Sequence, residues 1–69
     1  MDITLVIPTY NEAENVPILL ENVYRIFAEH GLDGRVTIVD DNSPDGTWKV
    51  AEELKGRYTG LKVIRRMSW

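Results

Sequence analysis

The stretch Val36–Gly46, VTIVDDNSPDG, decides the fold of this chain, because a short apolar run ends there in a cluster of acidic and turn-forming residues. Val36–Val39 is β-branched throughout, which is typical of a strand covered on both faces. Asp40–Gly46 combines Asp, Asn, Ser, Pro and Gly, the composition of a turn. We therefore expect a buried strand that leads into a polar turn and then into a helix.

Two further apolar runs, Ile3–Ile7 and Leu61–Ile64, flank this strand in the sequence and also read as strands. The segments between the runs have apolar residues at helical spacing, which predicts amphipathic helices. The apolar positions are Val16, Leu19, Leu20, Val23, Tyr24, Ile26 and Phe27 in the first segment and Trp48, Ala51, Leu54 and Tyr58 in the second. The predicted fold class is α/β, a three-stranded parallel sheet of the form β-α-β-α-β.

Capping residues indicate where these helices begin and end. We expect Asn15 to cap the first helix and the helix to end at Gly31. Ser43–Pro44 is the expected start of the second helix, which should end within Gly56–Gly60.

The order of the elements predicts that one face of the sheet is uncovered. If the strands lie in the order 1-2-3, right-handed crossovers place both helices on the same face. The strands are apolar on both sides, so we expect the opposite face to pack against sequence beyond this chain or against a second copy of it.

Length and composition indicate an ordinary globular segment, which we interpret as a single partial domain over residues 1–69. Of the 69 residues, 43% are hydrophobic and 28% charged, and the net charge of −3 does not favour a nucleic-acid surface. The absence of cysteine excludes disulfides and a cysteine nucleophile. The sequence has neither a run long enough to span a bilayer nor a signal-peptide pattern, so we expect a soluble segment.

Polar side chains with binding chemistry follow the first strand. Tyr10 offers a ring on which a base could stack, and Glu12 offers an acceptor for ribose hydroxyls. The spacing Thr9-x-x-Glu12 also fits a capping box, and Asn11 fits an N-cap, so these residues could instead start the helix.

A pair of carboxylates ends the second strand. Asp40 can accept hydrogen bonds from the imino and amino groups of uracil or guanine. Asp41 is interpreted mainly as a residue that satisfies backbone amides of the following turn, and Asp45 as part of that turn.

The segments Val6–Glu12 and Val39–Thr47 together resemble the start of a family 2 glycosyltransferase, most closely the branch of dolichol-phosphate (polyprenyl-phosphate) mannose synthases. The resemblance implies the N-terminal part of a GT-A type, Rossmann-like nucleotide-sugar-binding domain. It also implies that a nucleotide pocket is lined by Pro8, Tyr10, Glu12, Ile38, Asp40 and Asp41, with Asp40 reading the base and Ile38 packing beside it.

The same resemblance implies a donor of the GDP-mannose or UDP-glucose type and a polyprenyl (dolichyl) phosphate acceptor. It implies Mg²⁺ or Mn²⁺ for the full-length family, held by an Asp-x-Asp motif that this sequence lacks. A parent enzyme would be a cytoplasmic hexosyltransferase at a membrane face, and we expect no turnover from this chain alone. We therefore assign it no catalytic residue and no metal ligand.

Other interpretations remain open at this point. Arg65–Arg66 could approach a diphosphate, but surface charge is the favoured interpretation of these two residues. A receiver domain is disfavoured because the Asp pair follows the second strand rather than the first, and a dinucleotide-binding domain because the first turn lacks Gly-x-Gly-x-x-Gly. The main alternative function is a non-catalytic, truncated or designed α/β module that self-associates over its exposed sheet face.

Overall fold

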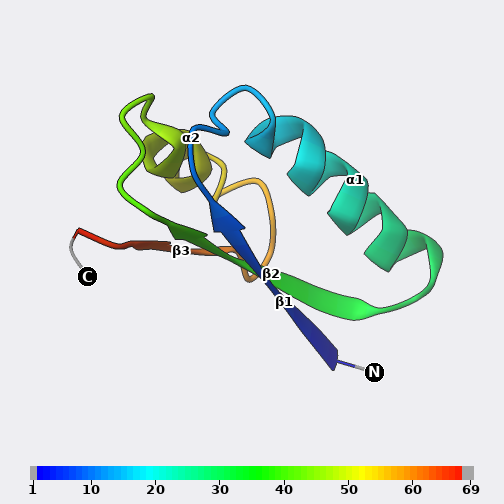
Figure 1. Cartoon of the computed structure of the whole chain (residues 1–69). Coiled ribbons are helices and arrows are strands. Elements are labelled where there is room, and N and C mark those ends of the chain that lie inside the picture. The colour runs from blue at the N-terminus through cyan, green and yellow to red at the C-terminus, as the bar shows by residue number, and fades with distance from the viewer. Residues whose placement is uncertain (1, 68–69) are drawn as a thin grey trace.

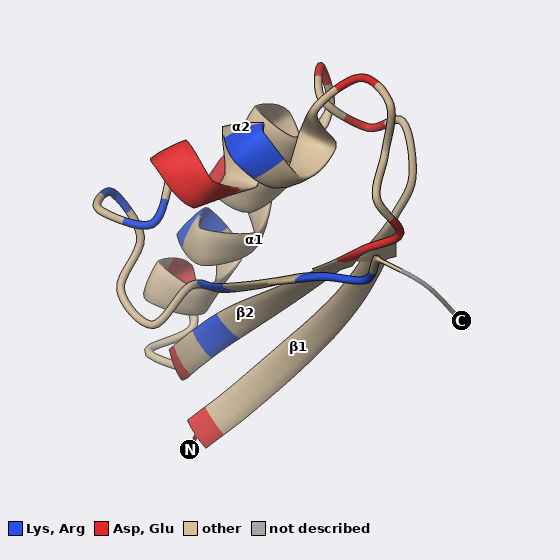
Figure 2. Ribbon diagram, turned by 90° about the vertical axis from the view of Figure 1, so that its left-hand side faces the viewer, with Lys and Arg blue, Asp and Glu red and all other residues tan. Residues whose placement is uncertain are grey.

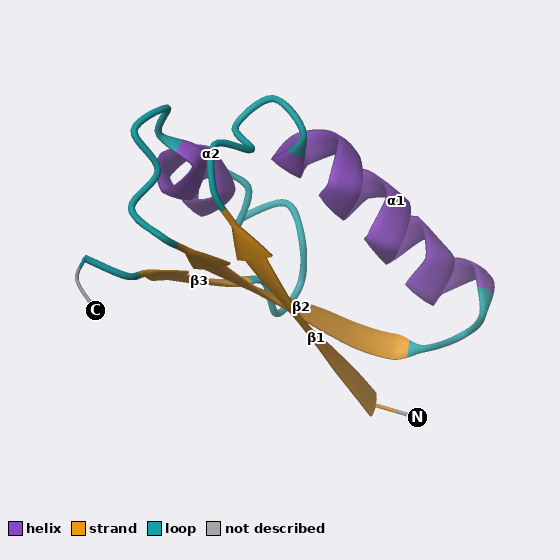
Figure 3. Ribbon diagram, viewed as in Figure 1, coloured by secondary structure: helices purple, strands orange, loops and turns teal. Residues whose placement is uncertain are grey.

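The computed structural model, which describes residues 2–67, contains a three-stranded parallel sheet with both helices packed on one face (Figures 1 and 3). The elements in chain order are β1 (Asp2–Thr9), α1 (Val16–Glu29), β2 (Asp33–Asp40), α2 (Thr47–Glu53) and β3 (Lys62–Arg65). The strands lie in the order β1-β2-β3. The predicted α/β class, the parallel pairing and the placement of both helices on one face are confirmed.

The register of the strands brings their carboxyl ends to one rim of the sheet. Thr9 of β1 lies opposite Asp40 of β2, and Asp40 lies opposite Arg65 of β3. The β1–α1 loop (residues 10–15) and the β2–α2 loop (residues 41–46) therefore leave the sheet side by side.

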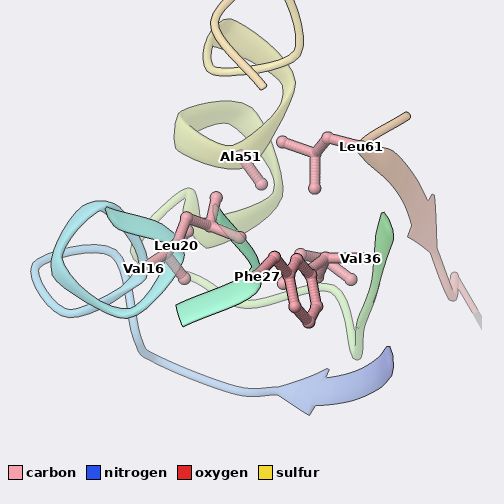
Figure 4. Close-up of a cluster of buried hydrophobic side chains, with 7 residues drawn as sticks. Val16, Leu20, Phe27, Val36, Ala51 and Leu61 are labelled. Carbon is pink, nitrogen blue, oxygen red and sulfur yellow. The ribbon is translucent and has the colours of Figure 1, made fainter. Parts of the chain in front are cut away.

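The hydrophobic core fills the space between the sheet and the two helices (Figure 4). Its buried members come from α1, β2, α2 and the segment before β3, and they are Val16, Leu20, Phe27, Val36, Ile38, Ala51 and Leu61. The Phe27 ring lies directly over Gly34 of β2, where a Cβ atom would come within 2.3 Å of the ring. This close approach fixes the distance between α1 and the sheet.

Tyr24 of α1 adds polar contacts to this packing. Its hydroxyl accepts a hydrogen bond from Val36 N at 3.2 Å and donates one to Thr59 O at 3.0 Å. Its ring stacks on Tyr58 with centroids 4.8 Å apart, and burial raises the pKa of the phenol. One side chain thus connects α1, β2 and the segment that precedes β3.

The expected boundaries of the second helix are wrong at both ends. The N-cap of α2 is Gly46, at φ +78°, because the Ser43 hydroxyl is used in contacts with other segments. The helix ends at Glu53, and Leu54 O then accepts from the amides of Arg57 and Tyr58 in a series of turns. A helix of seven residues is only marginally stable, and the glycine at position 56 disfavours its extension.

The first helix begins where the sequence indicated but ends earlier, at Glu29, with His30 as its C-cap. Asn15 occupies the N-cap position without capping through its side chain, which instead donates to Glu12 Oε2 at 2.9 Å. The start of the helix is therefore stabilised by backbone hydrogen bonds to Glu12 O and by Pro17 in the first turn.

The face of the sheet opposite the helices carries exposed apolar side chains. Val36 and Ile38 point into the core, so their neighbours Thr37 and Val39 point to the other face. The strand partners of those neighbours are Val6, which is 59% exposed, and Ile64, which is 50% exposed. The prediction of an uncovered apolar face is confirmed for the described residues. Within residues 2–67, no helix is long and apolar enough to cross a membrane.

Candidate functional site

The β1–α1 loop is joined through its backbone to side chains of the β2–α2 loop and of the first residue of α2. Three consecutive amides of the β1–α1 loop act as donors. The pairs are Asn11 N to Ser43 Oγ at 2.9 Å, Glu12 N to Thr47 Oγ1 at 2.9 Å and Ala13 N to Asp45 Oδ2 at 3.1 Å. The β1–α1 loop, which carries Tyr10 and Glu12, therefore takes its position from side chains that follow β2.

Asp40 lies beneath this junction and is fully buried. Its Oδ1 atom accepts hydrogen bonds from Thr9 Oγ1 at 2.8 Å and Ser43 Oγ at 2.6 Å, and its Oδ2 atom accepts one from Ser43 N at 2.9 Å. These donors supply the stabilisation that a buried carboxylate needs. Asp40 is thus the residue that organises the start of the β2–α2 loop.

Asp41 lies higher on the rim than its neighbour, with a side chain that is 34% exposed. Its Oδ1 atom pairs with Arg66 Nε at 3.5 Å, and the basic end of β3 runs beside the acidic end of β2 in Figure 2. The sequence assigned the hydrogen bonds with the turn mainly to Asp41. In the structure Asp40 accepts them, because the pleat directs its side chain inward. Asp41 is the aspartate of the pair that is accessible from solvent.

Asp45 holds the other end of the junction. Its Oδ1 atom accepts from both the hydroxyl and the amide of Thr47, at 2.5 and 3.0 Å. The hydrogen bond from the Thr47 hydroxyl, aided by the amides of Thr47 and Ala13, lowers the pKa of Asp45 below its ordinary value of 3.8. The prediction that Asp45 belongs to the turn is confirmed.

A hollow of about 330 Å³ lies where β1 ends and α1 begins. Its lining combines apolar walls with a carboxylate and an amide: Ile7, Pro8, Thr9, Glu12, Asn15, Val16 and Leu19. Of the residues predicted for a nucleotide site, Pro8 and Glu12 line this hollow. Such a mixture of apolar wall and few polar groups is the usual lining of a small-molecule site.

The other predicted site residues lie at different depths. Tyr10, the first residue after β1, is 56% exposed. Ile38 is fully buried in the core, below Asp40, and supports the rim from within. Tyr10, Glu12 and Asp41 are therefore the polar members of the predicted set that are not buried, and they lie on two neighbouring loops.

The capping interpretation of the first loop is wrong. Thr9 donates its hydroxyl to Asp40 rather than to a helix amide, and the N-cap of α1 is Asn15 instead of Asn11. Asn11 has φ +54°, a left-handed conformation that asparagine tolerates better than most residues. These residues shape the loop and do not start the helix.

Sequence reasoning missed the hydroxyl residues Thr9, Ser43 and Thr47, all of which are buried. A hydroxyl both donates and accepts, so each can connect a carboxylate to another group. The spacing of Ser43 and Thr47 around Asp45 in a polar turn was the available signal, although it does not reveal their partners 32 and 35 positions away.

The described residues do not form a metal centre. Within residues 2–67, no three side chains of the His, Cys, Asp and Glu types gather closely enough to hold an ion. Asp40 and Asp41 are adjacent in sequence, but the pleat separates them, and Asp40 is already surrounded by donors. The two aspartates therefore do not form a site for a divalent cation, and no step of the proposed chemistry is assigned to a metal ion here.

An α/β sheet with polar loops at the carboxyl rim belongs to the class of folds that bind ligands at this rim. Residues 4–68 match the family described as Glycosyl transferase family 2. The chain therefore belongs to this family, and its sheet corresponds to the N-terminal part of the GT-A type, Rossmann-like domain.

Two relatives illustrate the similarity. The chain is 46% identical over 66 residues to a dolichol-phosphate mannosyltransferase of Pyrococcus furiosus, with 96% of the chain and 18% of that protein covered. It is 42% identical over 50 residues to a polyprenol monophosphomannose synthase of Mycolicibacterium smegmatis, with 72% of the chain and 17% of that protein covered. The chain thus spans less than a fifth of the length of either relative.

Proposed function

We propose that this chain binds the nucleotide of a nucleotide sugar, and that a protein containing it transfers the sugar to a polyprenyl phosphate. The family and the printed names of the two relatives support the type of reaction. GDP-mannose or a UDP-sugar is the proposed donor, and Mg²⁺ or Mn²⁺ would be held by residues outside this chain.

The observation that carries the proposal is the joined pair of loops at the rim. Three hydrogen bonds hold the β1–α1 loop against the β2–α2 loop, so that Tyr10, Glu12 and Asp41 lie on neighbouring loops. An aromatic ring and two carboxylates are suited to a nucleoside, which offers a flat base, N–H donors and ribose hydroxyls.

Each residue has a separate role in this proposal. Tyr10 stacks on the base, and Glu12, with Pro8 beside it in the hollow, accepts from the ribose. We assign the contact with the base edge to Asp41 in place of Asp40. The oxygens of Asp40 already accept three hydrogen bonds, and its side chain is fully buried. Asp40 and Ile38 support the site from below.

Titration of the chain with GDP, UDP, GDP-mannose and UDP-glucose, with and without Mn²⁺, tests the proposal by calorimetry. We expect a nucleoside diphosphate to bind, and Tyr10→Ala and Asp41→Asn to weaken binding by about tenfold each, the equivalent of one good contact. Asp33→Asn, which removes a carboxylate at the opposite end of β2, is the matched control and should leave the affinity unchanged. Equal binding by all variants would refute the site.

A second candidate function is favoured by the uncovered sheet face. Val6 and Ile64 are at least half exposed there, and a chain that buries this face against a second copy would be a self-associating module. Sedimentation of a dimer with no calorimetric response to any nucleotide would support this function in place of the first.

A further inference from the structure

The end of β3 contacts both the β2–α2 loop and the start of α2 through Arg65. The Nε atom of Arg65 donates to Asn42 Oδ1 at 3.0 Å. The guanidinium carbon of the same residue lies 3.9 Å from the ring centroid of Trp48, in the first turn of α2. A planar guanidinium can use its edge for a hydrogen bond and its face for an aromatic ring at the same time. Arg65 therefore connects the beginning of the loop to the helix that follows it.

The next residue, Arg66, acts on the neighbouring positions of the loop. Its amide donates to Asp40 O at 2.7 Å, which continues the pairing of β2 and β3 past the end of the strand. Its Nε atom lies 3.5 Å from Asp41 Oδ1. Two consecutive arginines thus contact three consecutive residues, from 40 to 42.

The conformation of the β2–α2 loop needs support from contacts outside it. Asn42 has φ +54°, a conformation that is less stable for residues with a side chain than the extended or helical one. The loop also supplies the Ser43 and Asp45 oxygens that hold the β1–α1 loop. A shift of Asn42 would therefore move Asp41 directly and the β1–α1 loop indirectly.

We propose that Arg65 and Arg66 are positioning residues of the nucleotide site rather than ligands of the diphosphate. They hold Asp41 and Asn42 in the arrangement that receives the base, with Trp48 as the surface against which Arg65 is fixed. The proposal rests on the proposed function, and it differs from phosphate binding in a measurable way. A positioning residue affects the base end of the ligand, whereas a phosphate ligand affects only molecules that carry phosphate.

The test compares nucleosides with their diphosphates. Guanosine and GDP, and uridine and UDP, are titrated into the chain and into Arg65→Gln by calorimetry at constant salt. We expect the variant to bind the nucleoside and the diphosphate more weakly by the same factor, about five- to tenfold, because the lost contacts act on the loop. A loss confined to the diphosphates would overturn the proposal in favour of phosphate contact.

Two sets of variants control for charge and for shape. Lys62→Ala removes a positive charge from the same strand and should change no affinity by more than about twofold, since exposed charges contribute little. Trp48→Phe retains a ring for Arg65 and should preserve most of the nucleoside affinity, whereas Trp48→Leu should reproduce the loss caused by Arg65→Gln. Equal losses in the Phe and Leu variants would contradict the role given to the stack.

A measurement without ligand separates this proposal from the proposed function. In NMR spectra of the free chain, the backbone amides of residues 41–43 and the side-chain amide of Asn42 should shift in Arg65→Gln and stay in place in Lys62→Ala. If the unmodified chain bound no nucleotide, the proposed function would fail, and these shifts would still decide whether Arg65 positions the loop. Bound nucleotide with unmoved loop amides would refute the positioning role alone.

Discussion

The adjacent residues Asp40 and Asp41 differ completely in environment, and this difference defines the site at the residue scale. One carboxylate is fully buried under three hydrogen bonds, and the other is partly exposed beside an arginine. The alternation of side chains at the end of a strand produces this contrast. The inner residue therefore contributes to stability, and the outer one is the residue for which we propose a ligand contact.

Replacing each aspartate by asparagine separates the two roles. Asp40→Asn places an amide NH₂ group where an oxygen now accepts from hydroxyl or amide donors, so we expect the free energy of unfolding to fall by about 1–3 kcal/mol. Asp41→Asn should change it by less than about 0.5 kcal/mol, as is usual at the surface. Urea denaturation followed by circular dichroism measures both. Equal effects would contradict the division of roles.

Acid should loosen the junction of the loops through Asp45. The folded pKa of this carboxyl is lowered by its Thr47 and Ala13 partners, so the native state favours the charged form. Its contribution to stability is complete above the ordinary pKa and is lost as the pH falls through the lowered folded value.

We therefore expect this part of the stability to be constant between about pH 7 and pH 5 and to decline below about pH 4. The urea midpoint, measured across this range, reports the change. In Asp45→Asn the dependence below about pH 4 should become shallower, and an unchanged slope would show that Asp45 is not responsible.

At the scale of elements, the packing of α1 on β2 depends on one glycine. Gly34 lies so close to the Phe27 ring that an added methyl group would require the ring or α1 to move. Gly34→Ala should lower the free energy of unfolding by about 1–3 kcal/mol, as overpacking does in well-packed cores. Gly56→Ala is the matched control, because its Cβ would meet nothing within 4 Å.

The control should be neutral or slightly stabilising, since it reduces the freedom of the unfolded chain without a native clash. The prediction fails if the two variants have the same denaturation midpoint. It also fails if Gly34→Ala is as stable as the unmodified chain.

The sequence predicted the elements better than their connections. β-branched runs and helical spacing identified three strands and two helices, and right-handed crossovers placed both helices on one face for the strand order 1-2-3 that the structure has. The start of α2 was misplaced because Ser43–Pro44 resembles a helix start in isolation. Ser43 is instead committed to Asn11 and Asp40, and a contact across 32 positions leaves no local signal.

The candidate site was predictable in location but not in detail. Polar residues at the ends of Ile3–Ile7 and Val36–Val39 indicated the rim, since parallel strands end on the same edge. Which aspartate faces inward depends on the pleat of the finished sheet, and the supporting roles of Thr9 and Thr47 depend on the register of β1 with β2. Those properties are set by tertiary packing.

At the scale of the whole molecule, the sheet is covered on one face and uncovered on the other (Figure 3). A lysine at Val6, which is 59% exposed on the uncovered face, should change the free energy of unfolding of this chain by less than about 0.5 kcal/mol. A lysine at Val36, which is fully buried under the helices, should prevent folding because an unpaired charge in the core is very costly.

Circular dichroism and sedimentation velocity measure the two consequences of these changes. If the chain associates through the uncovered face, Val6→Lys should also shift the sedimentation coefficient toward that of a monomer. A Val6→Lys variant as unstable as Val36→Lys would show that this face is covered within the chain itself.

The three consecutive amides at positions 11–13 have one further consequence, which concerns motion. Each donates to an oxygen from the β2–α2 loop or the first residue of α2, so these hydrogen bonds should slow the exchange of all three protons with solvent. Deuterium should therefore enter all three positions more slowly than in the unfolded chain, with the least protection at Ala13, whose hydrogen bond is exposed. A molecule that binds at the rim should slow the exchange of all three amides further.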